Sequence, residues 1–234
     1  MGLNIRNDLF FLLGVIAFFL PFFISREVFD AYYQFNLEHG LVMSFIKFSI
    51  LATLGEVIGL RIKTGKYHQK GFGLLPRAIV WGFLGVSIYM AFAIFAEGTP
   101  LLLEKVGFKN ASLLLHSDLS WKKVLVSFSI GTALNLFYAP VMMTFHKITD
   151  IHILENGGTL RGFFKPIPFA RLFREINWDV QWNFVFKKTI PFFWIPAQTI
   201  TFLLPEEYRV LFAAFLGIIL GVLLAIASLM DRKI

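Results

Sequence analysis

GLVMSFIKFSILATLGEVIGL, the stretch from Gly40 to Leu60, decides the fold class because only Lys47 and Glu56 interrupt its apolar run with a charge. A transmembrane helix needs about 20 consecutive, mainly apolar residues. Five further apolar stretches resemble it, at 9–24, 78–96, 124–145, 189–204 and 208–230. We therefore predict an all-α, polytopic transmembrane helical bundle with six spans, or five if Leu9–Ile24 only lies in the membrane interface.

Composition supports the same class. The chain is 57% hydrophobic and 16% charged, with a mean hydropathy of +0.69, and its apolar residues form long runs rather than alternating patterns. The absence of cysteine excludes disulfides, thiolate metal sites and cysteine nucleophiles. A net charge of +7 is interpreted as membrane-flanking charge, so the expected partner is a lipid bilayer and not nucleic acid.

The distribution of basic residues predicts the orientation. With six spans, one face carries 15 of the 22 lysine and arginine residues, the other carries 6, and Lys47 lies inside a span. The positive-inside rule then places both termini and the long loop after residue 145 on the cytoplasmic side. We expect a bacterial cytoplasmic membrane, with an organelle inner membrane as the alternative.

Two regions are predicted: residues 1–39 form an N-terminal apolar segment with an interfacial linker, and residues 40–234 form the membrane bundle. Ser25–His39 is polar with scattered aromatics and predicts a short interfacial helix. In the long loop, Asn156-Gly157-Gly158 indicates a turn. The apolar and basic residues of Phe169–Ile176 predict an amphipathic helix on the membrane surface.

Small residues recur at four-residue intervals along two spans and at Gly55 and Gly59 in a third. In lipid, such stripes let helix backbones approach closely and gain van der Waals contact. They predict tight packing within the bundle, and a homo-oligomer is compatible with them. The predicted packing residues are Gly55, Gly59, Gly131, Ala213, Gly217, Gly221 and Ala225, with Ser127, Asn135 and Ala139 completing the stripe around Gly131.

Polar side chains inside the spans are the candidate functional residues, because lipid offers them no partner. Lys47 and Glu56 are nine residues apart and fall on opposite helix faces, so they do not pair with each other. A buried amide often serves only to bond a neighbouring backbone. Taken together, however, five side chains predict one polar path: Glu56, Tyr89, Asn135, Gln198 and Thr201. The five histidines show no metal-type spacing, so no metal or other cofactor is expected.

The segment from Trp194 to Arg209 interrupts a span with polar residues and prolines. Trp194, Pro196, Gln198, Phe202, Pro205 and Arg209 fit the pattern Trp-x-Pro-x-Gln-x-x-x-Phe-x-x-Pro-x-x-x-Arg. In this pattern the chain resembles the family of the twenty-two-kilodalton peroxisomal membrane protein and its mitochondrial relatives of the Mpv type. Pro196 and Pro205 are predicted to break the fifth helix, and Arg209 to anchor the following turn against Glu206, Glu207 or a headgroup.

Weaker matches lie upstream, between about Gly40 and Ser228. Gly55-Glu56 stands where the family usually has Gly-Asp, and Thr201 where it often has Asn. Gly85, Tyr89 and Phe92 retain part of a Gly-Pro-x-x-His-x-Trp-Tyr pattern, and Leu134-Asn135 before Pro140 replaces Asp-Gln. The resemblance implies a small-solute channel of four spans, so the first predicted span is extra.

The sequence leaves three functions open. The first is a passive or gated channel for small polar metabolites, without enzymatic chemistry, in which Glu56 sets the charge preference. The second is a non-catalytic structural or assembly protein, which the packing stripes favour. The third is an intramembrane enzyme acting on lipid, which depends only on Glu56 and the scattered histidines.

Overall fold

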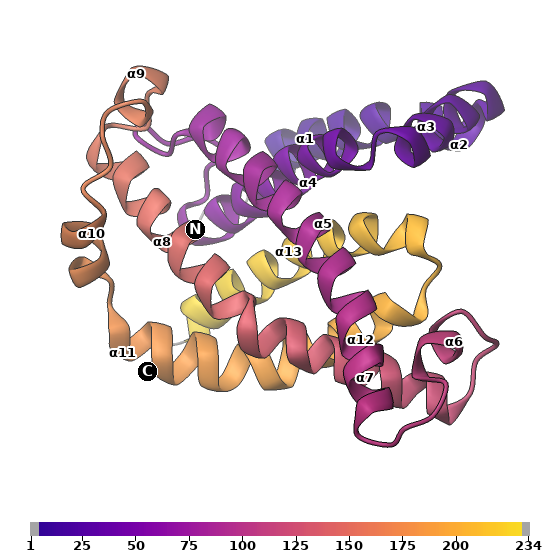
Figure 1. Ribbon diagram of the computed structural model, residues 1–234. Helices are drawn as coiled ribbons and strands as arrows, with labels where there is room; N and C mark the ends of the chain where they lie inside the picture. The colour runs from indigo at the N-terminus through magenta and orange to yellow at the C-terminus, as the bar shows by residue number, and fades with distance from the viewer. Residues whose placement is uncertain (1–4, 231–234) are drawn as a thin grey trace.

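The computed structural model describes residues 5–230, except for the side chains of Leu220 and residues 223–230. Over this range the chain is all-helical, as predicted (Figure 1). The first half contains α1 (Ile5–Phe19), α2 (Pro21–Ile24), α3 (Arg26–Glu38), α4 (Gly40–Thr64), α5 (Leu74–Lys105), α6 (Ala111–Leu115) and α7 (Trp121–Phe137). The second half contains α8 (Ala139–Glu155), α9 (Leu160–Phe163), α10 (Phe169–Glu175), α11 (Trp178–Val180), the π-helix η1 (Gln181–Trp194), α12 (Ile195–Leu203) and α13 (Glu206–Met230).

Two described helices, α4 and α5, are long and apolar enough to cross a membrane, and α7 with α8 adds a third if the pair is one span. The predicted count of six spans is therefore confirmed only in part. The predicted span 124–145 is bent by 44° between α7 and α8. Pro140, at the start of α8, explains the bend, because it lacks an N–H and its ring crowds the carbonyl of the residue four positions earlier.

The region around 189–204 is the fifth predicted span, which Pro196 and Pro205 were expected to break, and it consists of two helices of different type. Its first part belongs to η1, a wide π-helix that contains Pro191, and its second part is α12. Pro196 lies in the first turn of α12, where a missing N–H costs nothing. Pro196 therefore marks a change of helix type, whereas Pro205 follows the end of α12, where the chain turns into α13.

The N-terminal helices α1 to α3 lie along one side of the bundle and contain no buried residue (Figure 1). The Arg61 guanidinium donates two hydrogen bonds to the Asp8 carboxylate, at 2.7 and 2.8 Å, which attaches α1 to the end of α4. The predicted helix after Ser25 is present as α3, and the Ser25 hydroxyl caps it by accepting from the N–H of Val28. Lys47 does not face Glu56; its ammonium group donates to Asn36 on α3.

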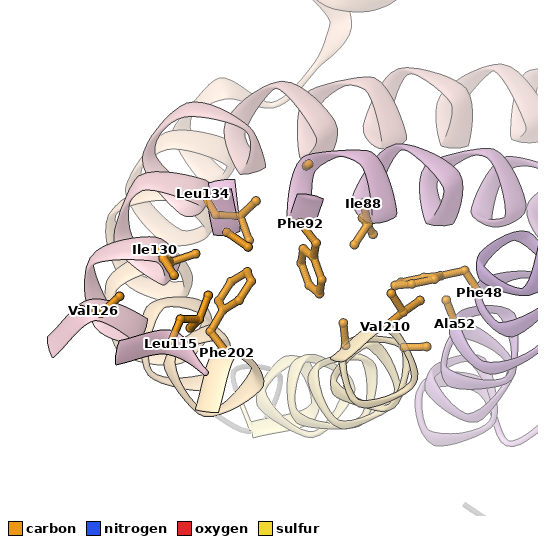
Figure 2. Packing of buried hydrophobic residues seen from close by; sticks show 14 of the residues in the cluster. Phe48, Ala52, Ile88, Phe92, Leu115, Val126, Ile130, Leu134, Phe202 and Val210 are labelled. Carbon is orange, nitrogen blue, oxygen red and sulfur yellow. The ribbon is translucent and has the colours of Figure 1, made fainter. Parts of the chain in front are cut away.

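Helices α4, α5, α7, α12 and α13 form the hydrophobic core (Figure 2). Phe202 of α12 is fully buried beside Ile130 and Leu134 of α7, and its ring centroid lies 5.1 Å from that of Phe92 on α5. Apolar burial of this kind contributes about 1.5–3 kcal/mol for a large side chain. Phe202, one of the six signature positions, is thus a packing residue that joins three helices.

Glycines set the closest helix contacts. A Cβ atom on Gly55 of α4 would lie 2.9 Å from the Cα of Ile218 on α13, and one on Gly221 would lie 3.1 Å from the Gly55 carbonyl oxygen. Gly217 makes an ordinary contact with Ala52, and Gly59 and Ala213 are buried. Gly55, Gly217 and Gly221 occupy the α4–α13 crossing, where the predicted stripe lies. The side chain of Ala225 is outside the described part of the structure.

The loop after α8 follows the sequence pattern closely. Gly157 and Gly158 have φ angles of 70° and 66°, values that favour glycine, and they form the predicted turn. The predicted amphipathic helix is α10, on which Leu172 is fully buried while Phe169 and Phe173 are exposed.

Candidate functional site

Two groups of buried polar side chains are candidates for function, and they differ in how well their atoms are partnered. The first, here called the charge cluster, joins α4, α5 and α8. It consists of Glu56, Arg77, Trp81, His146, Lys147 and Asp150.

Glu56 is the centre of the charge cluster, and three donors surround its carboxylate. Arg77 Nη1 lies 2.5 Å from Oε2, while Trp81 Nε1 and His146 Nε2 lie 2.8 Å and 3.2 Å from Oε1. The Trp81 and His146 rings are in contact, with centroids 4.4 Å apart. A carboxylate with this many partners is well stabilised despite its burial.

Arg77 links Glu56 to a second acid. Its Nη2 pairs with Asp150, and its Nε donates to the carbonyl oxygen of Phe72 at 2.7 Å. Lys147 Nζ adds a longer contact of 3.5 Å to Asp150. Two acidic and two basic side chains therefore balance in charge, and the geometry of the guanidinium fixes α4, α5 and α8 relative to one another.

The sequence prediction identified Glu56 and missed its partners. Arg77 and Trp81 are four residues apart on α5, and His146 and Asp150 are four apart on α8, so each pair lies on one helix face. This spacing was the available signal. Net charge alone presents Arg77 as a membrane-flanking residue, and the spacing of the histidines does not connect His146 with Glu56.

The second group lies where α7 packs on α12, here called the α7–α12 seam. A Cβ on Gly131 would lie 3.1 Å from the backbone nitrogen of Thr199 and 3.3 Å from the Cβ of Gln198, so the two backbones are in near contact. Ser127 and Asn135 lie one helical turn before and after Gly131, and both are buried. The small-residue stripe of α7 therefore faces α12.

Several polar atoms at or beside the seam are buried without a partner. Within the described residues, no hydrogen-bonding group lies in reach of Ser127 Oγ, Thr132 Oγ1, Gln198 Oε1 or Trp194 Nε1. Ser127 is fully buried, and Gln198 is 6% exposed. Leaving such an atom unpaired costs about 1–3 kcal/mol, so the packing of α7 on α12 includes an unfavourable desolvation cost.

The five predicted path residues do not all meet. Asn135, Gln198 and Thr201 belong to α7 and α12; Asn135 Nδ2 donates to the Gly131 carbonyl, and Thr201 Oγ1 to that of Ala197. Glu56 belongs to the charge cluster instead. Tyr89 packs against Gly40, at the other end of α4. At a rise of about 1.5 Å per residue, Gly40 lies roughly 24 Å from Glu56 along that helix. A single path through all five is absent from this conformation of the described chain.

The remaining signature residues surround the end of the seam. Arg209, which is 6% exposed, donates from Nε to the carbonyl oxygen of Leu204 at 3.1 Å. It thus anchors the α12–α13 turn, as predicted, but through the backbone. Among the described residues no carboxylate lies within 4.0 Å of it, so Arg209 forms no close ion pair with Glu206 or Glu207, and the expected headgroup contact stays a prediction.

Comparison of the chain with known proteins found no matching family model, curated protein or solved structure. Within the described residues, no group of three or more His, Cys, Asp or Glu side chains is placed to hold a metal ion.

Proposed function

We propose that this protein is a gated membrane conduit for small polar solutes, and that the path follows the α7–α12 seam. One observation carries the proposal: Ser127 Oγ and Gln198 Oε1, on the two helices of the seam, are both buried without a partner. A conformation that admits a polar solute between α7 and α12 supplies these atoms with hydrogen bonds and offsets their desolvation cost.

The charge cluster serves as the fixed frame in this proposal. It holds α4, α5 and α8 together through partnered charges, so the seam opens against a rigid part of the bundle. The bend at Tyr138 separates α8, which belongs to the cluster, from α7, which belongs to the seam. Tyr138 itself is held to α5 by a hydrogen bond of 2.6 Å between its hydroxyl and that of Ser87.

The setting proposed for this conduit is the bilayer. The apolar faces of α4 and α5 support a membrane location, and the remaining predicted spans complete a bundle of six. The resemblance of Trp194–Arg209 to the Mpv-type family supports solute passage, and the bias of basic residues to one side supports a bacterial cytoplasmic membrane. No catalytic residue is assigned.

Reconstitution in liposomes tests the proposal. We expect liposomes that contain the protein to release small trapped solutes, such as glycerol or a small amino acid, faster than empty liposomes do. Gln198→Met keeps the side-chain length and removes the amide, so it should reduce release severalfold. Gln34→Met, at an exposed glutamine on α3, is the matched control and should leave release unchanged.

Release equal to that of empty liposomes, at every potential and pH tried, would overturn the conduit. Co-purification of a stoichiometric partner protein together with that result would favour the structural or assembly alternative. Equal release by the Gln198→Met and wild-type proteins would retain a conduit but remove the seam as its path.

A further inference from the structure

A cleft lies at the end of the bundle where α12 turns into α13. Its volume is about 400 Å³, and its walls come from the end of α6, the start of α7 and the α12–α13 turn. Lys123, Leu204, Pro205, Glu206, Glu207 and Arg209 contribute to its lining. Because Lys123 and Leu204 flank the α7–α12 seam, the cleft is also the end of that seam.

Arg209 is the residue that points to a ligand. Its side chain is buried except for 6% of its surface, and it lines the cleft. The bond from Nε to Leu204 fixes one edge of the guanidinium, and the Phe202 ring supports it, with 5.5 Å between the guanidinium carbon and the ring centroid. Across the described residues, no group accepts a hydrogen bond from its two terminal nitrogens. A guanidinium held in this way presents two parallel donors suited to a carboxylate or phosphate.

The other charges of the cleft restrict that ligand. Glu206 and Glu207 line the same space with two carboxylates, whereas the ammonium group of Lys123 is engaged with the carbonyl oxygen of Ser117 at 2.7 Å. An anion without a positive group would bind Arg209 but be repelled by both acids. A simple cation would be attracted by the acids and repelled by Arg209.

We propose that this cleft binds a small zwitterion, whose carboxylate or phosphate pairs with Arg209 and whose ammonium group pairs with Glu206 and Glu207. Two sources share this chemistry: a free metabolite, such as an amino acid or phosphoethanolamine, and the headgroup of phosphatidylethanolamine. The site is independent of the proposed conduit, because its geometry is complete whether or not a solute crosses the membrane.

Calorimetry on the purified full-length protein in detergent tests the binding chemistry. Three probes are compared. Phosphoethanolamine carries both charges, inorganic phosphate only the negative charge, and ethanolamine only the positive charge. We expect phosphoethanolamine to bind at least tenfold more tightly than either of the others. Phosphate binding as tightly as phosphoethanolamine would overturn the zwitterion site.

Variants assign the binding to these residues. Arg209→Gln should weaken phosphoethanolamine binding at least tenfold, while Lys122→Gln, next to the cleft but outside its lining, should change nothing. The double variant Glu206→Gln/Glu207→Gln keeps the Leu204 anchor and should bind phosphoethanolamine no better than phosphate. Equal binding by the double variant and the wild type would contradict the proposal, even if Arg209→Gln fails to fold.

Lipid retention separates the two sources. Native mass spectrometry of protein extracted from mixed phosphatidylethanolamine and phosphatidylglycerol vesicles should show retained phosphatidylethanolamine, lost in Arg209→Gln, if the headgroup is the ligand. Binding of free phosphoethanolamine without retained lipid assigns a soluble metabolite. If the protein neither binds phosphoethanolamine nor retains phosphatidylethanolamine, the proposed site is overturned.

Discussion

The charge cluster and the α7–α12 seam are both polar and both buried, yet they differ in whether their polar atoms have hydrogen-bond or ion-pair partners. In the cluster, Glu56 accepts from three donors and Arg77 pairs with two acids. In the seam, Ser127 Oγ and Gln198 Oε1 have no partner among the described residues. Partnered buried charges hold helices in one arrangement, whereas unpaired buried atoms favour a second arrangement in which they are satisfied. The cluster is therefore a region whose buried charges are partnered, and the seam is the region that we propose to open.

Removing the central cation of the cluster should have the largest effect. Arg77→Met leaves Glu56 and Asp150 close together without the charge between them, and breaking a buried pair in this way costs about 3–5 kcal/mol. Denaturant unfolding in detergent measures the loss. Lys147→Met is the control, because the Lys147 side chain is 45% exposed and 3.5 Å from Asp150, so about 1 kcal/mol or less is expected. Equal losses from both variants would show that the cluster does not hold the helices.

The backbones of α7 and α12 are already in near contact at Gly131, so a larger side chain at that position should destabilise the protein. Gly131→Leu pushes a side chain against the α12 backbone, which a Cβ alone would approach to 3.1 Å; overpacking of this kind costs about 1–3 kcal/mol. Gly98→Ala is the control for an uncrowded glycine. Nothing lies within 4 Å of a Cβ at this position of α5, and alanine has a higher helix propensity than glycine. The melting temperature should fall for the first and hold or rise for the second. A seam that accepts leucine without loss is not closely packed.

Replacing the unpaired amide should stabilise the closed form. Gln198→Met removes an unsatisfied oxygen and retains the volume, so the protein gains about 1 kcal/mol. Asn135→Leu is the useful contrast, because it removes the bond from Asn135 to the Gly131 carbonyl at 2.8 Å. Thermal unfolding of both variants gives the comparison. A clear loss of stability in Gln198→Met would mean that its oxygen has a partner and that the seam resembles the cluster.

The smallest effect concerns a partly buried contact at the edge of the bundle, between Asp8, Arg61 and Tyr67. Hydrogen bonds from Arg61 and Tyr67 lower the pKa of Asp8 below its ordinary value of 3.8. The contact therefore contributes stability fully above pH 3.8, and this contribution is lost as the pH falls through the lowered pKa of the folded state. Hydrogen exchange of α1 should increase over that acidic range. Asp8→Asn should show the faster exchange already at neutral pH, and an unchanged α1 would remove this role from Asp8.

Much of the fold was predictable from the sequence. Long apolar runs define α4 and α5, a polar stretch with scattered aromatics indicates α3, and paired glycines define the turn at 157–158. These features depend on residues close together in the chain. The bend at Tyr138 was less visible, because Pro140 was noted only as part of a family pattern, and the wide turns of η1 have no distinct sequence signal.

The candidate site was predictable only in part, since partner choice depends on how distant helices are arranged. Glu56 was recognisable as an unusual buried acid, but its pairing with Arg77 joins residues on separate helices. Gln198 and Asn135 were predicted to line a polar path with Glu56, and both are buried, although nothing in the sequence places them at one helix contact or shows which of them lacks a partner. Arg209 likewise gave no sign that the backbone, and not an acid, would anchor it.

The most direct test of the opening seam uses the absence of cysteine from the chain. Ser127 and Ser44 are both fully buried, but the Ser44 hydroxyl donates to the Gly85 carbonyl oxygen at 2.6 Å, whereas Ser127 has no partner in the described structure. Ser127→Cys and Ser44→Cys, in membranes, would be treated with a small charged methanethiosulfonate reagent. The account predicts that the cysteine at 127 reacts at least tenfold faster than the one at 44. Equal protection of both positions would contradict a seam that opens to polar solutes.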